Sequence, residues 1–74
     1  MIKVYVLTNC QRCEELKSYM RKNNIAFKEL NVEQNSKALA KMTMEGLDKY
    51  PVIEINGILY SDDVDNLKKI VAVK

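Results

Sequence analysis

Residues 3–13 read KVYVLTNCQRC, a short β-branched and aromatic run that leads directly into two cysteines. Residues 3–7 are apolar at most positions, as in a central strand that is covered on both faces. Cys10 and Cys13 are the only cysteines of the chain, and the two residues between them match the spacing of a reversible dithiol. The amphipathic residues that follow predict a strand, a dithiol and then a helix.

The helix predicted at residues 11–23 places the two sulfur atoms differently. Cys13, Leu16 and Met20 recur at intervals of three and four residues, so Cys13 falls on the inward face and Cys10 at the mouth of the site. Both sulfur atoms lie in the first turn, where unpaired backbone N–H groups and the helix dipole favour a negative charge. A thiolate is the reactive form of cysteine, and such a position lowers a thiol pKa. Cys10 is therefore the expected attacking thiolate, and Cys13 the thiol that resolves a mixed disulfide.

The composition predicts one small domain, residues 1–74, with 47% hydrophobic and 30% charged residues. The net charge is +2 and the two signs are interspersed, which argues against a nucleic-acid-binding surface of clustered lysine and arginine. The apolar stretches are only a few residues long, so no membrane span is expected. Residues 1–4 read as a strand rather than as a secretion signal, which makes a reducing cytoplasm the expected location.

The absence of histidine excludes several catalytic classes. Ser-His and Cys-His catalysis both need an imidazole. A tetrahedral zinc site usually needs four Cys or His ligands, and this chain offers only its two cysteines. No metal ligands are therefore assigned within one chain, and a site shared between two chains is left as an alternative.

The middle of the chain predicts a second strand and a second helix. A strand within residues 25–32 completes a strand–helix–strand unit with parallel pairing and a right-handed crossover. Ser36 is the expected N-cap of the next helix, which ends before Gly46 and packs through Leu39, Met42 and its alanines. The methionines are interpreted as core-filling side chains.

The last third of the chain predicts a hairpin and a third helix. Residues 52–55 and 58–60 read as strands joined by Asn56-Gly57, the strongest short hairpin signal. Ser61 is the expected cap of the last helix, with two aspartates in its first turn. The expected buried stripe of that helix is Val64, Leu67 and either Ile70 or Val71. The predicted order is β-α-β-α-β-β-α, an α/β fold with one sheet and helices on its faces.

This order, with the dithiol at the first strand-to-helix junction and Lys49-Tyr50-Pro51 before the third strand, resembles the glutaredoxins and the NrdH-type redoxins over essentially the whole chain. The resemblance implies a minimal thioredoxin fold, with a mixed four-stranded sheet and helices on both faces. It also implies that the Tyr50–Pro51 peptide bond is cis and that Pro51 faces the dithiol. The turn would then present the Tyr50 backbone to an extended substrate, which pairs with it as a short β-strand beside Cys10.

Three features depart from the glutaredoxin pattern. Leu7 stands where glutaredoxins often have a lysine for the carboxylate of glutathione, and Gln11-Arg12 replaces the common Pro-Tyr pair between the cysteines. The Gly-Gly that lets glutathione approach the backbone before an acidic pair is also missing. Arg12 and Lys49 are the candidate replacements for the carboxylate partner.

The resemblance implies a dithiol–disulfide oxidoreductase that reduces protein or glutathione mixed disulfides, with ribonucleotide reductase as a candidate partner. Cys10 and Cys13 are its catalytic residues. No bound cofactor is required, and the external reductant is either glutathione or thioredoxin reductase with NADPH. We expect a monomer. The expected substrate-binding residues are Gln11, Arg12, Lys49, Tyr50, Pro51, Asp62 and Asp63.

Several of these binding residues also have simpler interpretations. Arg12 is either a solvated charge or a stabiliser of the Cys10 thiolate that attracts an acidic partner, and Glu14 and Glu15 act against the second role. Tyr50 either contacts substrate or is ordinary half-buried packing. The two aspartates are most simply helix-start charges, and binding of a substrate amino group is the alternative.

Two functions of other classes remain open from the sequence. Two chains could pool their cysteines around an iron–sulfur cluster or a metal ion, or the domain could be a redox-inert binding module of the same fold. A visible absorption band on purification would favour the carrier. An unperturbed Cys10 pKa without disulfide reductase activity would favour the binding module.

Overall fold

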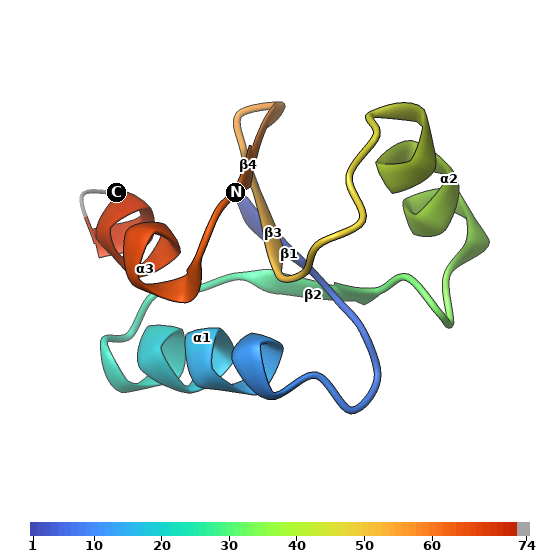
Figure 1. The fold of residues 1–74 in the computed structure, drawn as a ribbon. Coiled ribbons are helices and arrows are strands. Elements are labelled where there is room, and N and C mark those ends of the chain that lie inside the picture. Colours follow the sequence, from blue (N-terminus) through green and yellow to red (C-terminus); the bar gives the residue numbers. More distant parts are fainter. Residues whose placement is uncertain (73–74) are drawn as a thin grey trace.

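The computed structural model describes residues 1–72. Its elements follow the predicted order and are β1 (Ile2–Val6), α1 (Gln11–Lys22), β2 (Lys28–Asn31), α2 (Ser36–Met44), β3 (Val52–Ile55), β4 (Ile58–Ser61) and α3 (Val64–Ala72). The strands form one four-stranded sheet in the order β2-β1-β3-β4. Helices α1 and α3 lie together on one face of this sheet and α2 lies on the other (Figure 1). No helix within residues 1–72 has the length and apolar character that a membrane crossing demands.

The central strand β1 is covered on both faces, as predicted. It pairs in parallel with β2 and antiparallel with β3, which makes the sheet mixed. At the β3–β4 turn, Asn56 and Gly57 have φ values of 52° and 82°. A two-residue type I′ turn requires such left-handed values at both positions, so the hairpin prediction is confirmed together with its turn chemistry.

The predicted packing face of α2 was partly wrong. Met42 is fully buried and Ala38 nearly so, but Leu39 is 46% exposed and Ala40 also faces solvent. α2 contacts the sheet along a single stripe. Ala38 and Met42 are four residues apart and share this stripe, whereas Leu39, next to Ala38, points away from it. Met44 is 85% exposed. The interpretation of the methionines as core-filling side chains holds for Met42 and fails for Met44.

The boundaries of two other elements also differ from the prediction. β2 is confined to Lys28–Asn31, because only these residues lie in register against β1. Ser61 does not cap α3: it ends β4, and the Oδ1 of Asp63 accepts the Asn66 N–H at 2.9 Å. Asp63 therefore performs the capping role, and the Asp62-Asp63 pair precedes the helix instead of lying in its first turn. The buried stripe of α3 consists of Val64, Leu67 and Val71.

Asn35, and not the predicted Ser36, is the N-cap of α2. Its backbone is extended and its Oδ1 accepts the Ala38 N–H at 3.0 Å. Asn35→Ala should lower the free energy of unfolding by about 1 kcal/mol, because this N–H loses its acceptor. Ser36→Ala is the matched control and should be close to neutral. Denaturant unfolding of both variants measures the difference, and an equal loss from Ser36→Ala would contradict the assignment.

Two charged side chains are buried where the sequence predicted none. Lys17 on α1 is 6% exposed and binds Glu14 and Glu29, each at 2.8 Å, which joins α1 to the edge strand β2. Glu54 on β3 is 8% exposed on the opposite face of the sheet. It accepts hydrogen bonds from the Tyr5 hydroxyl at 2.5 Å and from Lys41 of α2 at 2.9 Å. Both buried charges are therefore partnered, as buried charges need to be.

The buried Glu54 should make the stability of the protein depend on pH. The hydrogen bond from Tyr5, followed by that from Lys41, lowers the pKa of Glu54 below its ordinary value of 4.5, although burial opposes this shift. A carboxyl with a lowered folded pKa contributes stability above its unfolded pKa and loses it as the pH falls through the folded pKa. Glu54→Gln should cost about 1–2 kcal/mol at pH 7. The difference in unfolding free energy between Glu54→Gln and wild type should shrink below pH 4.5, because Glu54 of the wild type then becomes protonated.

Urea unfolding of wild type and Glu54→Gln from pH 7 down to pH 3 measures this difference. Glu45→Gln removes an exposed carboxylate and serves as the control, for which we expect little change. If the loss of unfolding free energy in Glu54→Gln stays constant down to pH 3, the loss arises from packing and not from the charge of the carboxylate.

Candidate functional site

Cys10 and Cys13 are joined by a disulfide at the N-terminus of α1, with Cα atoms 5.2 Å apart. Cys13 is completely buried, while Cys10 is partly exposed. The Cys10 Sγ occupies the N-cap position and accepts the Cys13 N–H at 3.2 Å. In the reduced dithiol, the same N–H and the helix dipole favour a thiolate at Cys10. The structure therefore places an accessible sulfur at the mouth of the site and an inaccessible one behind it.

The loop that carries Cys10 is anchored by residues that the sequence did not single out. The Thr8 N–H donates to Glu33 Oε1 at 2.7 Å, and Asn31 donates to the Thr8 hydroxyl at 3.1 Å. Hydrogen bonds from the Thr8 side chain and backbone lower the pKa of Glu33. Asn9 then takes a left-handed φ of 56°, which turns the chain into the dithiol. These contacts join segments about 25 positions apart, so no local pattern could have indicated them.

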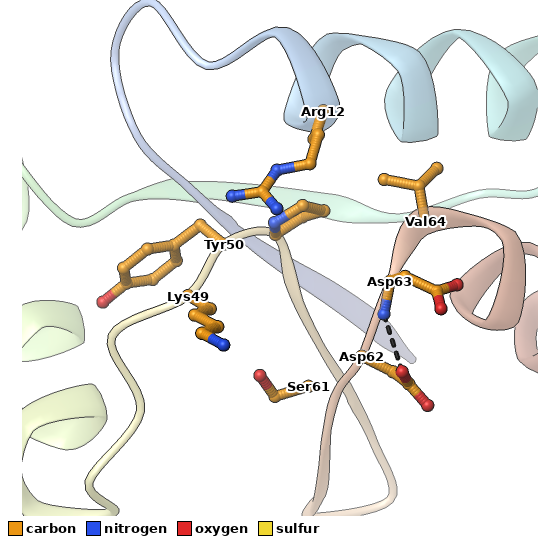
Figure 2. A pocket seen from close by; sticks show the side chains of 8 residues that line it. Arg12, Lys49, Tyr50, Ser61, Asp62, Asp63 and Val64 are labelled. Atoms are coloured by element: carbon orange, nitrogen blue, oxygen red, sulfur yellow. Dashed lines mark hydrogen bonds between the residues drawn. The ribbon is translucent and has the colours of Figure 1, made fainter.

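A groove of about 270 Å³ is lined on one side by Arg12, the residue that directly precedes Cys13. Its lining residues are Arg12, Lys49, Tyr50, Pro51, Ser61, Asp62, Asp63 and Val64 (Figure 2). All the substrate-binding residues expected from the sequence line this groove except Gln11, which is exposed outside it. Ser61 and Val64 are additional lining residues. Their proximity to the acidic pair in the chain was the only signal that could have indicated them.

The turn before β3 lies at the centre of the groove. The Tyr50–Pro51 peptide bond is cis, as the resemblance implied, and Pro51 is buried. Tyr50 as a whole residue is only 7% exposed, and its ring points away from the acidic pair (Figure 2). Burial, and secondarily the nearby Asp48, raises the pKa of the Tyr50 hydroxyl. The aromatic ring of Tyr50 therefore offers little surface to a ligand in the groove.

The groove carries charges of both signs. Arg12 reaches toward the Tyr50–Pro51 turn from the start of α1, while Asp62 and Asp63 lie before α3 (Figure 2). Asn66 holds both carboxylates, since its backbone N–H donates to Asp63 and its side-chain amide donates to Asp62 at 3.2 Å. Within residues 1–72, none of the cationic or anionic groove residues takes part in an ion pair. These four charges are available to a ligand that carries both an anionic and a cationic group.

The carboxylates expected to oppose Arg12 are engaged elsewhere. Glu14 pairs with Lys17 at 2.8 Å and Glu15 pairs with Lys68 at 3.0 Å. A hydrogen bond from Lys17 lowers the pKa of Glu14, and one to Glu15 raises the pKa of Lys68. Because each carboxylate has its own lysine, their opposition to the positive charge of Arg12 is reduced.

The disulfide region contains few potential metal ligands. Over residues 1–72, no three Cys, Asp or Glu side chains are gathered in a way that could hold a metal ion. A disulfide with one accessible sulfur is a group that takes part in thiol–disulfide exchange.

Comparison with known proteins identifies relatives of the same size. The glutaredoxin family model matches residues 2–59. The glutaredoxin-like protein NrdH of Lactococcus lactis subsp. cremoris is 30% identical over 82% of this chain and 85% of its own length. A glutaredoxin-like 8.6 kDa protein encoded in the rubredoxin operon of Clostridium pasteurianum is 34% identical over 77% of each chain.

Solved structures show the same fold. NrdH-redoxin from Escherichia coli superimposes with a TM-score of 0.79 at 21% identity, covering 93% of this chain and 92% of its own. The thioredoxin-like protein BC3987 superimposes with a TM-score of 0.81 at 22% identity, covering 95% and 99% of the two chains. At this level of identity, the comparisons establish the minimal thioredoxin-like architecture.

Proposed function

The chain belongs to the glutaredoxin family of thiol–disulfide oxidoreductases, and from this membership we propose that it is a dithiol reductase of protein disulfides that works through Cys10 and Cys13. The observation that carries the proposal is the position of the Cys10 Sγ. It is partly exposed, caps α1 and accepts the Cys13 N–H, while its disulfide partner is buried. An attacking and a resolving cysteine need this difference in access.

The reaction proceeds in two exchanges. The Cys10 thiolate attacks one sulfur of the substrate disulfide, so that a mixed disulfide forms and the other substrate sulfur leaves as a thiolate. The Cys13 thiolate, formed by loss of its proton, then attacks the Cys10 sulfur and releases the second substrate thiolate. The substrate gains two electrons and, on protonation of its thiolates, two protons. The protein is left with the Cys10–Cys13 disulfide, which is the state in the structure.

The groove that Arg12 lines supplies the substrate contacts in this proposal. An extended substrate segment pairs with the Tyr50 backbone as a short added strand, which brings its disulfide to Cys10. Arg12 and Lys49 attract carboxylates of the substrate, and Asp62 and Asp63 attract its amino groups. Gln11 lies outside the groove, so it contacts only a substrate that extends beyond it.

Glutaredoxin-family proteins use external reductants, and we assign thioredoxin reductase with NADPH to this chain in preference to glutathione. Leu7 cannot bind a carboxylate, and the four residues 58–61 between the hairpin turn and the acidic pair contain no glycine. From the resemblance to the NrdH-type redoxins, the small dithiol donors to ribonucleotide reductase, we also propose ribonucleotide reductase as the protein substrate. The proposal includes a cytoplasmic location and a monomer as the working form.

NADPH-coupled reduction of a disulfide substrate tests the proposal. One reaction contains glutathione and glutathione reductase, and the other contains thioredoxin reductase alone, with Cys10→Ser as the control in both. We expect turnover that depends on Cys10 in the second reaction. Turnover only with glutathione would overturn the choice of reductant. If neither reaction depends on Cys10, the reductase function itself is wrong.

The charges of the groove should determine substrate affinity without changing the exchange chemistry. Arg12→Gln combined with Lys49→Gln should raise KM for an acidic disulfide peptide by about tenfold. Each lost ion pair should weaken binding by about 0.5–1 kcal/mol, and two such losses together correspond to about tenfold. The kcat should change less than KM, provided that the Cys10 thiolate is stabilised mainly by the helix terminus. Lys22→Gln combined with Lys69→Gln removes the same charge from exposed positions outside the groove and is the control. An equal rise of KM in the control would contradict the assignment.

A further inference from the structure

A second groove, on the face of the sheet that carries α2, is lined by four lysines. It measures about 260 Å³ and lies between α2 and the strands β1 and β2. Lys3 and Lys28 come from the two strands, and Lys37 and Lys41 come from the helix. We call it the lysine groove. It is separate from the dithiol, because Cys10 caps α1 on the opposite face of the sheet (Figure 1).

The lysines occupy positions that are unfavourable for the isolated fold. Lys3 and Lys28 are Cα partners in the parallel β1–β2 register, so two positive charges lie on adjacent strands and repel each other. Lys37 and Lys41 are four residues apart on α2, which is destabilising on a helix. Lys37 also lies in the first turn of α2, where the helix dipole disfavours a cation and where no acidic residue is present.

Little negative charge compensates this cluster. Lys41 pairs with the buried Glu54 at 2.9 Å. Lys3, Lys28 and Lys37 form no ion pair within residues 1–72. Glu54 faces Lys3 in the β1–β3 register, but it already accepts hydrogen bonds from Tyr5 and Lys41. Three of the four lysines, namely Lys3, Lys28 and Lys37, are therefore not neutralised by a carboxylate within residues 1–72.

We propose that the lysine groove binds the di- or triphosphate group of a small molecule. Two like-charge pairs and a cation in the first turn of a helix converge on one concave surface, and a multivalent anion placed there would relieve all three unfavourable interactions. A groove of about 260 Å³ has room for two or three phosphate groups. Lysine ammonium groups bind phosphate oxygens through charge-assisted hydrogen bonds from several directions.

Isothermal titration calorimetry at low ionic strength tests the proposal with four probes: pyrophosphate, tripolyphosphate, ATP and a poly-glutamate peptide. Saturable binding of tripolyphosphate is expected. Tighter binding of ATP than of tripolyphosphate would identify a nucleotide as the source of the phosphates, and equal binding would identify the inorganic ion. The absence of binding by every phosphate probe would overturn the proposal, as would a clear preference for the peptide, which would indicate an acidic polypeptide partner.

Two double variants separate the groove from overall charge. Lys28→Gln with Lys37→Gln should weaken tripolyphosphate binding by at least about tenfold, because each lysine contributes a charge-assisted hydrogen bond. Lys22→Gln with Lys69→Gln removes the same charge from exposed positions outside the groove and should change binding by less than about twofold. An equal loss in both variants would show that binding follows net charge, which overturns the proposal.

Thermal unfolding with and without tripolyphosphate distinguishes lost binding from lost structure. The groove variant should unfold at the same temperature as wild type or higher, because two like-charge contacts are removed. Tripolyphosphate should raise the Tm of wild type and of the control variant, but not that of the groove variant. The Cys10-dependent reductase assay is independent of this site, so failure of either proposal leaves the other intact.

Discussion

Cys10→Ser should abolish disulfide reduction, whereas Cys13→Ser should halt the reaction after its first exchange. Without the Cys10 sulfur there is no accessible nucleophile, since Cys13 is completely buried. We expect turnover to fall by at least about a thousandfold, as is usual when a catalytic nucleophile is removed. Without Cys13, the mixed disulfide at Cys10 has no neighbouring thiolate to resolve it, so it should accumulate.

Intact-mass spectrometry under non-reducing conditions measures the two outcomes directly. When Cys13→Ser is mixed with a disulfide peptide in the absence of glutathione, nearly every chain should gain the mass of one peptide that is joined to Cys10 by a disulfide. Cys10→Ser should remain unmodified. A stable adduct on Cys10→Ser would reverse the assignment of the two cysteines and would contradict their difference in burial. Serine is close to cysteine in size, so both variants should keep the fold.

Leu16→Ala should strongly destabilise the protein. Leu16 is completely buried on α1, one turn beyond Cys13, where α1 packs against the sheet and α3. Truncating it removes apolar burial and leaves a cavity, at a cost of about 2–5 kcal/mol. A domain of this size has only a few kcal/mol of total stability. A substantial fraction of the variant should therefore be unfolded at 37 °C.

Leu39→Ala is the matched control, since it makes the same chemical change at a position that is 46% exposed. Its cost should stay below about 1 kcal/mol, because little apolar surface is returned to water and alanine is the better helix former. Urea denaturation of both variants gives the comparison. Equal losses would mean that Leu39 packs against the sheet, as the sequence pattern suggested, and would contradict the position of α2.

The local signals of the chain determined the element order and the position of the cysteine pair at the start of α1. The CxxC spacing, the three- and four-residue recurrence of Cys13, Leu16 and Met20, and Asn56-Gly57 each act within a few residues. The helix, its buried face and the hairpin could therefore be predicted without knowledge of the rest of the fold. The parallel pairing of β1 with β2 followed from the length of the connection between them.

The tertiary structure alone decided which side of α2 faces the sheet, which residues cap α2 and α3, and which charges are buried. Ala38 against Leu39 and Asn35 against Ser36 are choices between adjacent residues, and local sequence preference did not decide them. Lys17 and Glu54 are buried against their partners Glu29 and Tyr5. These partners lie 12 and 49 positions away in the chain, so no local pattern could predict the burial. The meeting of Arg12, Pro51 and Asp62 in one groove, and of four lysines in another, has the same origin. Such contacts depend on strand register and helix docking, which bring together residues that have no relation along the chain.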